Sequence, residues 1–124
     1  MEKQEVIEFI KNNPVFYLAT TKNNTPKVRG MLLYSVDNEG IIFHTYIKKN
    51  IYKEIMANNL AEACFNCNKK GQVRVSGKVI EIKDKNLKDE ILNHPTRTDE
   101  RRKSSLKYIY WVQLNNTKDR LNII

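Results

Sequence analysis

The chain has 124 residues, of which 40% are hydrophobic and 29% are charged, and this size and composition are typical of one globular domain covering residues 1–124. With only four glycines and three prolines, the composition excludes a disordered or collagen-like chain. The formal net charge of +8 favours anionic partners. The basic residues are spread along the chain without a nucleic-acid-binding motif, so nucleic acid is not the expected partner. The densest basic segment, within residues 97–107, is interpreted as a solvated face.

The N-terminal residues predict a short amphipathic helix and not a targeting signal. They are polar and acidic, whereas a secretory signal is basic and then apolar. No stretch of the chain approaches the roughly 18 consecutive apolar residues of a membrane span, so we expect a cytoplasmic protein that does not associate with membranes. Within residues 3–12, helical spacing places Val6, Ile7 and Ile10 on one stripe, and Pro14 ends the helix.

Five or six antiparallel strands with helices at the periphery are predicted for the whole chain. A two-residue alternation of apolar side chains marks the strands, and a 3.6-residue period marks two further helices. The predicted strands cover residues 15–20, 27–36, 41–45, 61–67, 72–82 and 108–114, and the further helices cover residues 50–59 and 84–93. Short strands separated by polar turns are typical of a mainly β fold, a barrel or a sandwich.

The strand over residues 27–36 carries an arginine on an apolar face. Alternation places Arg29 on the same side as Met31 and Leu33. Because burying an unpaired charge is costly, Arg29 requires an anionic partner, which is either a protein side chain or a ligand.

The helix over residues 50–59 follows a pair of lysines. Lys48 and Lys49 stand just before the helix N-terminus, where the helix dipole favours anions over cations. Together with free backbone N–H groups and the hydroxyl of Thr45, they are suited to binding a monophosphate. An exposed lysine pair without a ligand is the alternative. In the helix itself, Asn50 is the predicted N-cap and the predicted buried residues are Ile51, Ile55 and Met56.

The two cysteines form a C-x-x-C pattern, which in an intracellular chain is typical of a redox or metal site. Cys64 and Cys67 lie within the predicted strand over residues 61–67, where residues three apart point to opposite faces. Neither His44 nor His94 has metal-ligand spacing to them. The sequence therefore favours buried or half-buried free thiols over a dithiol or metal site.

Four segments together resemble the pyridoxamine 5′-phosphate oxidase-like family of FMN-binding split barrels. The similarity extends over about residues 5–95, and the intervening helix has the matching position. The segments are residues 26–33 (PKVRGMLL), 40–45 (GIIFHT), 48–49 (KK) and 72–79 (QVRVSGKV). The resemblance implies an antiparallel, Greek-key split barrel that binds FMN.

The resemblance also implies a set of cofactor-binding residues. Arg29 matches the arginine that reaches the flavin phosphate, and the backbone of the next three residues lies beside the flavin. Gln72 resembles a glutamine that contacts the flavin across a dimer. The full implied set is Arg29, Gly30, Met31, Leu32, His44, Thr45, Lys48, Lys49 and Gln72. In this family the flavin lies between two subunits, so a homodimer is implied as well.

The expected function follows the family except where the sequence departs from the family pattern. Members that oxidise pyridoxamine phosphate carry a lysine for the substrate phosphate where this chain has Tyr34, so vitamin B6 oxidation is not expected. The resemblance implies an FMN-dependent oxidoreductase that transfers hydride or electrons, supplied by a nicotinamide or a reduced partner, to a small substrate. Because the flavin carries the chemistry, no catalytic residue is assigned. The alternative is a non-catalytic flavin- or haem-binding module that acts as a store, sensor or scavenger.

Overall fold

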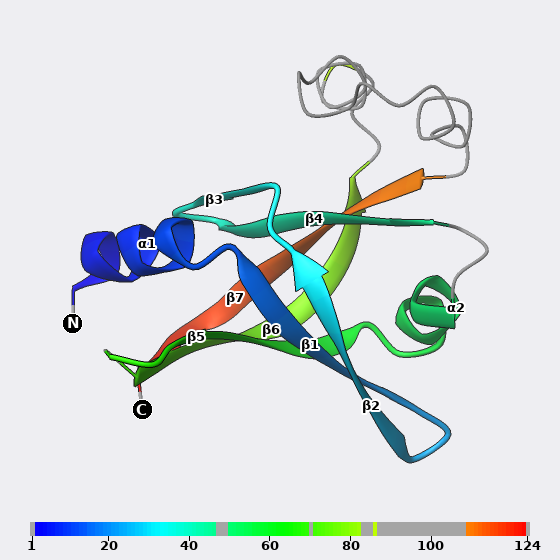
Figure 1. The fold of residues 1–124 in the computed structure, drawn as a ribbon. Coiled ribbons are helices and arrows are strands. Elements are labelled where there is room, and N and C mark those ends of the chain that lie inside the picture. The colour runs from blue at the N-terminus through cyan, green and yellow to red at the C-terminus, as the bar shows by residue number, and fades with distance from the viewer. Residues whose placement is uncertain (1, 47–49, 70, 83–85, 87–108, 124) are drawn as a thin grey trace, which may run out of the picture.

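Two helices and seven strands form the described part of the chain in the computed structural model (Figure 1). The structure describes residues 2–46, 50–69, 71–82, 86 and 109–123. In chain order the elements are α1 (Lys3–Asn12), β1 (Val15–Lys22), β2 (Thr25–Leu32), β3 (Ser35–Asp37), β4 (Gly40–Tyr46), α2 (Asn50–Ala57), β5 (Leu60–Cys67), β6 (Gly71–Ile82) and β7 (Ile109–Ile123). The predicted mainly β architecture is confirmed. Apart from Asn86, the predicted helix over residues 84–93 lies outside the described residues, as do His94 and the basic segment.

Helix α1 has the predicted bounds and the predicted buried stripe. Its apolar side chains, including Val6 and Ile10, are buried against the sheet. At its C-terminal end the backbone N–H of Asn13 donates to the carbonyl of Ile10 at 3.1 Å, and the Asn13 side-chain amide donates to the carbonyl of Phe9 at 2.9 Å. These two bonds satisfy helix-end carbonyls, and Pro14 then directs the chain into β1.

The seven strands form one antiparallel sheet in the order β2-β1-β5-β6-β7-β4-β3. The two strands at its ends, β2 and β3, are consecutive in the chain and are joined only by Leu33 and Tyr34. The sheet must therefore curl until its two edges meet. The backbone N–H of Leu33 donates to the carbonyl of Pro14 at 2.9 Å, and that of Tyr34 donates to the carbonyl of Ile42 at 2.8 Å. We call this junction the seam of the barrel.

The predicted single strand over residues 27–36 was wrong, because the seam divides it into β2 and β3. Leu32 pairs with Val15, the first residue of β1, so β2 has no further residue of β1 to pair with beyond this point. The chain then crosses to β4, where Ser35 pairs with Ile42. This break and the short β3 explain why the sheet has seven strands and not the five or six predicted.

The last strand is longer than predicted, because β6 pairs with both of its halves. Residues 115–120 are polar and have low β propensity, which led to a predicted end at residue 114. In the structure β7 pairs with β4 in its first half, and with β6 from Trp111 to Asn116 and again from Leu121 to Ile123. A register irregularity between Val75 and Gly77 accommodates the extra residues of β7 opposite β6.

The barrel interior is filled by aromatic and branched side chains. The ring of Phe16 stacks on Phe65, with centroids 4.8 Å apart, and meets Phe43 edge-on at 5.6 Å. All three are fully buried. The other buried core residues are Val6, Phe9, Ile10, Leu18, Ile41, Ile51, Ile55, Ala63, Val73, Val75 and Val79. Helices α1 and α2 lie at opposite ends of the sheet (Figure 1).

The buried stripe of α2 differs from the prediction at one position. Ile51 and Ile55 are buried as expected, but Met56 is 50% exposed, and the helix ends at Ala57 and not at residue 59. The third buried residue is Glu54. Positions i, i+3 and i+4 share one helix face, and Met56 lies about 100° away from Ile55 around the helix axis.

The cysteines lie in β5 as predicted, and both are partly buried free thiols in the structure. Within the described residues, no helix is both long and apolar enough to cross a membrane.

Candidate functional site

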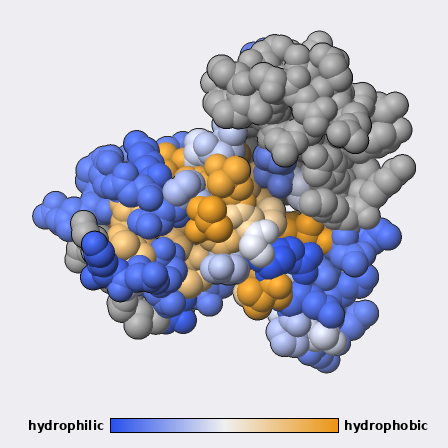
Figure 2. Space-filling model, in the orientation of Figure 1, coloured by the Kyte–Doolittle hydropathy of each residue, from blue (hydrophilic) through white to orange (hydrophobic). Residues whose placement is uncertain are grey.

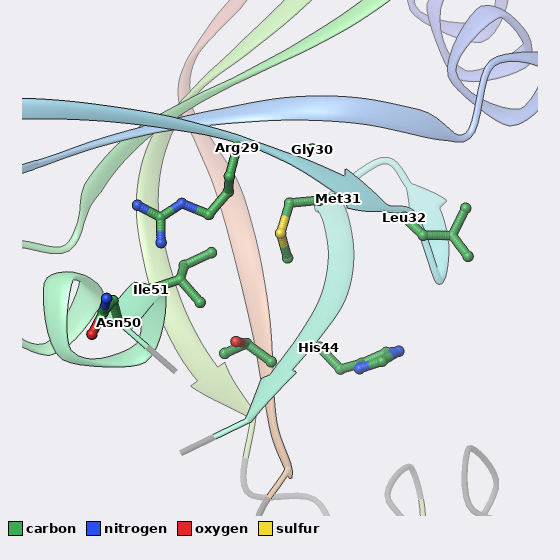
Figure 3. A pocket seen from close by; sticks show the side chains of 8 residues that line it. Arg29, Gly30, Met31, Leu32, His44, Asn50 and Ile51 are labelled. Carbon is green, nitrogen blue, oxygen red and sulfur yellow. The ribbon is translucent and has the colours of Figure 1, made fainter. Parts of the chain in front are cut away.

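One cavity combines the C-terminal ends of β2 and β4 with the N-terminal end of α2 (Figure 3). Its volume is about 410 Å³, which is within the usual range of small-molecule and cofactor sites, roughly 300–1,000 Å³. The lining residues are Arg29, Gly30, Met31, Leu32, His44, Thr45, Asn50 and Ile51. Six of them are residues for which the sequence resemblance implied a cofactor contact.

The fold explains why these residues meet. Strands β2 and β4 are far apart in the order of the sheet, but the curl of the barrel brings both next to the seam. In Figure 3 the guanidinium of Arg29 extends toward α2, where Asn50 and Ile51 begin the helix, and Leu32 and His44 lie toward the other side of the cavity. The wall is therefore polar at one end and mostly apolar along β2.

Arg29 has a protein partner that the sequence analysis did not identify. Its Nη2 donates a hydrogen bond to Oε2 of Glu54 on α2 and forms an ion pair with it. The same oxygen accepts a hydrogen bond from the Thr20 hydroxyl at 3.0 Å. Glu54 is 5% exposed. Three elements, β1, β2 and α2, thus each contribute one side chain to a buried polar cluster beside the cavity.

Glu54 is the anionic partner that the sequence analysis required for Arg29. The sequence also indicated that Glu54 would be buried. Its position is three residues after Ile51 and one before Ile55, which is the buried stripe of α2. A carboxylate on such a stripe needs a buried cation opposite it, and Arg29 on its apolar strand face was the matching candidate.

Two buried donors at the cavity make no hydrogen bond within the described residues. They are Nε of Arg29 and the hydroxyl of Thr45, whose residue is 2% exposed. Buried polar groups normally have partners, and both of these residues line the cavity. An anion with several acceptor oxygens, such as a phosphate ester, matches this donor set.

The remaining implied residues are not among the described residues that line this cavity. Lys48 and Lys49 lie outside the described residues. Gln72 is in β6 opposite Asn66, away from the lining residues, and its implied contact was with the flavin of a second subunit. Asn50, the predicted N-cap, is instead the first residue of α2.

A comparison with protein families gives one match. The family model of pyridoxamine 5′-phosphate oxidase matches residues 2–110, which include nearly all of the elements described above. No curated protein sequence matches the chain significantly.

Solved structures share the fold at low sequence identity. A pyridoxamine 5′-phosphate oxidase-related, FMN-binding protein from Nostoc punctiforme has a TM-score of 0.64 at 14% identity, covering 92% of this chain and 80% of that one. The FAD-binding protein from Mycobacterium smegmatis gives 0.67 at 17%, covering 95% and 90%. HutZ, the heme storage protein from Vibrio cholerae, gives 0.70 at 12%, covering 98% and 93%.

Proposed function

Because the chain belongs to the pyridoxamine 5′-phosphate oxidase family, we propose that it binds FMN in the cavity between β2, β4 and α2 and acts as an FMN-dependent oxidoreductase. The observation that carries this proposal is the pair of unpartnered buried donors, Arg29 Nε and Thr45 Oγ1, on two strands that line the same cavity. The solved relatives named for FMN and FAD binding are consistent with a flavin in this fold.

The cavity residues have distinct roles in this proposal. Arg29 and Thr45 hold the phosphate, and Lys48 and Lys49 add positive charge from the adjoining segment. Met31, Leu32 and Ile51 offer an apolar wall to the flavin ring. When bound, FMN supplies hydride or single-electron transfer. His44 lines the cavity, where its imidazole would be placed to hold a proton beside the bound flavin.

A homodimer is part of the proposal, because an apolar face lies beside the cavity. The outward side chains of β1 and β2 include Val15, Tyr17, Val28 and Leu32, all more than half exposed. Val15 pairs directly with Leu32 in the sheet, so the side chains of these two residues are neighbours on the same face. Figure 2 shows hydrophobic side chains gathered across the middle of the face in view, between hydrophilic regions. A second copy of the chain would cover this surface and enclose the cavity.

Spectroscopy with matched ligands tests the proposal. We expect the purified protein, or protein incubated with FMN, to show the visible absorption of oxidised flavin and to elute as a dimer in size-exclusion chromatography. Riboflavin, which lacks the phosphate, should bind at least about tenfold more weakly, since a hydrogen bond to a charged group contributes about 1.5–3 kcal/mol. Equal affinity for riboflavin and FMN would contradict a phosphate site at Arg29, and a Soret band after incubation with haem would favour the binding-module alternative.

The Thr45 hydroxyl gives a test in which binding and stability change in opposite directions. Replacing Thr45 by valine removes a buried hydroxyl that has no partner among the described residues, so the free energy of unfolding should stay constant or rise by up to about 1 kcal/mol. The affinity for FMN should fall by about tenfold. Urea denaturation and flavin fluorescence titration measure the two effects. A Thr45→Val protein that is less stable and binds FMN normally would show that the hydroxyl serves the fold instead.

A further inference from the structure

We infer that Glu54 is a built-in competitor for the phosphate site: its carboxylate holds Arg29 when no cofactor is bound and opposes the cofactor's negative charge when it is. The inference rests on the proposed function and adds a control on affinity. Its basis is the ion pair between Glu54 Oε2 and Arg29 Nη2, formed on the guanidinium whose Nε lacks a partner within the described residues.

The first step concerns the cofactor-free protein. Arg29 lies on an inward-facing position of β2, and its side chain is 25% exposed. Without an anion its charge would be poorly compensated. Glu54 supplies that anion from within the chain, and Thr20 donates to the same oxygen at 3.0 Å. The barrel therefore folds with its anion-binding residue already neutralised, and no ligand is needed to compensate the charge of Arg29.

The second step concerns the bound state. Glu54 is buried, and its carboxylate is held by donors from two different strands, so it remains near the guanidinium when a phosphate approaches. A phosphate bound by Arg29 would share this guanidinium with the fixed negative charge of Glu54. At such short separation and in the low dielectric of a partly buried site, like-charge repulsion is substantial. Glu54 accordingly lowers the affinity for a phosphate ester and leaves the affinity for an uncharged ring system unaffected.

The consequence is a cofactor that exchanges instead of one that is permanently held. The same carboxylate stabilises the cofactor-free fold and lowers the affinity of the protein for the phosphate of the cofactor. A residue that served the fold alone would affect stability without this opposite effect on binding, which makes the two roles separable.

The test is the Glu54→Gln variant, which keeps an oxygen acceptor for Thr20 and Arg29 but removes the charge. FMN and riboflavin titrations of cofactor-free protein are combined with urea denaturation, and Glu8→Gln, on the exposed face of α1, is the matched control. We expect Glu54→Gln to bind FMN at least about tenfold more tightly, to bind riboflavin unchanged, and to unfold at a lower urea concentration without ligand. Glu8→Gln should leave all three measurements unchanged.

Each other outcome counts against the inference. If the unaltered protein binds FMN and Glu54→Gln binds it equally or more weakly, Glu54 only positions Arg29 and the competitor role is overturned. If riboflavin binding tightens as much as FMN binding, the effect is not on the phosphate. If the unaltered protein does not bind FMN, the proposed function fails and this inference fails with it. Should Glu54→Gln not fold alone, FMN but not riboflavin must restore its folding, and failure of that rescue overturns the inference.

Discussion

Replacing Arg29 by methionine is expected to destabilise the protein by about 3 kcal/mol and to weaken FMN binding at least about thirtyfold. The first effect arises because the Glu54 carboxylate loses its cation while 5% exposed, and a buried charge without a partner is costly. We expect the lower end of the usual range, because the Arg29 side chain is 25% exposed. The second effect arises because the guanidinium is the cation of the proposed phosphate site.

A double variant separates these two effects. In Arg29→Met with Glu54→Leu, both charges are replaced by apolar groups, which is often neutral for stability. Thr20 loses its acceptor, so the double variant should lie within about 1 kcal/mol of the unaltered protein. It should still bind FMN more weakly than the unaltered protein, because the cation of the phosphate site is gone, but less weakly than Arg29→Met alone, because the Glu54 charge is gone as well. Urea denaturation and fluorescence titration provide both measurements.

The control is Lys27→Met, which removes an exposed cation from the same strand and should change stability by no more than about 0.5 kcal/mol. FMN binding that survives in Arg29→Met would remove Arg29 from the site. A double variant as unstable as the single one would show that the ion pair is not the source of the instability.

Replacing Phe16 by alanine is expected to cost about 4 kcal/mol of unfolding free energy. Phe16 is fully buried at the centre of the aromatic cluster and touches both Phe43 and Phe65. Its removal deletes apolar contacts and leaves a cavity that strands on both sides of the barrel cannot fill by relaxing. Because many domains have only 5–15 kcal/mol of stability, we expect a large fall in the urea midpoint.

A graded variant shows whether packing is the cause. Phe16→Leu retains most of the apolar volume and should cost less than about 1.5 kcal/mol. Equal losses in the two variants would indicate that the aromatic ring geometry and not the filled volume stabilises the barrel. A loss below about 1 kcal/mol in Phe16→Ala would contradict a closely packed interior.

The fold was predictable from the sequence wherever local periodicity decides the structure. Helix α1 and the bodies of β1, β4, β5 and β6 follow their apolar patterns. The break between β2 and β3 was not predictable in this way, because it depends on where β1 begins, at Val15, and on the hydrogen bond from Tyr34 to Ile42. The extension of β7 likewise depends on the length of β6 and not on the propensity of its own residues.

The candidate site was predictable in its residue types but not in its charge balance. The resemblance named the β2 and β4 residues, and the curl of the sheet brings them into one cavity. Glu54 was missed because the burial of a glutamate is decided by what faces it, and Arg29 is 25 residues away in the chain. The helical stripe of α2 carried the signal, but the more apolar Met56 was assigned to the buried position.

The seam has a further consequence for how ligand and fold depend on each other. Two residues, Leu33 and Tyr34, link the edge strands there, and their backbone N–H groups donate to Pro14 and Ile42. The cavity lies against the seam, with Arg29 on one edge strand and Thr45 on the strand beside the other. A molecule that contacts both side chains would link the two strands across the seam. Opening of the barrel would then require release of that molecule, so the local unfolding free energy at the seam would rise with ligand concentration.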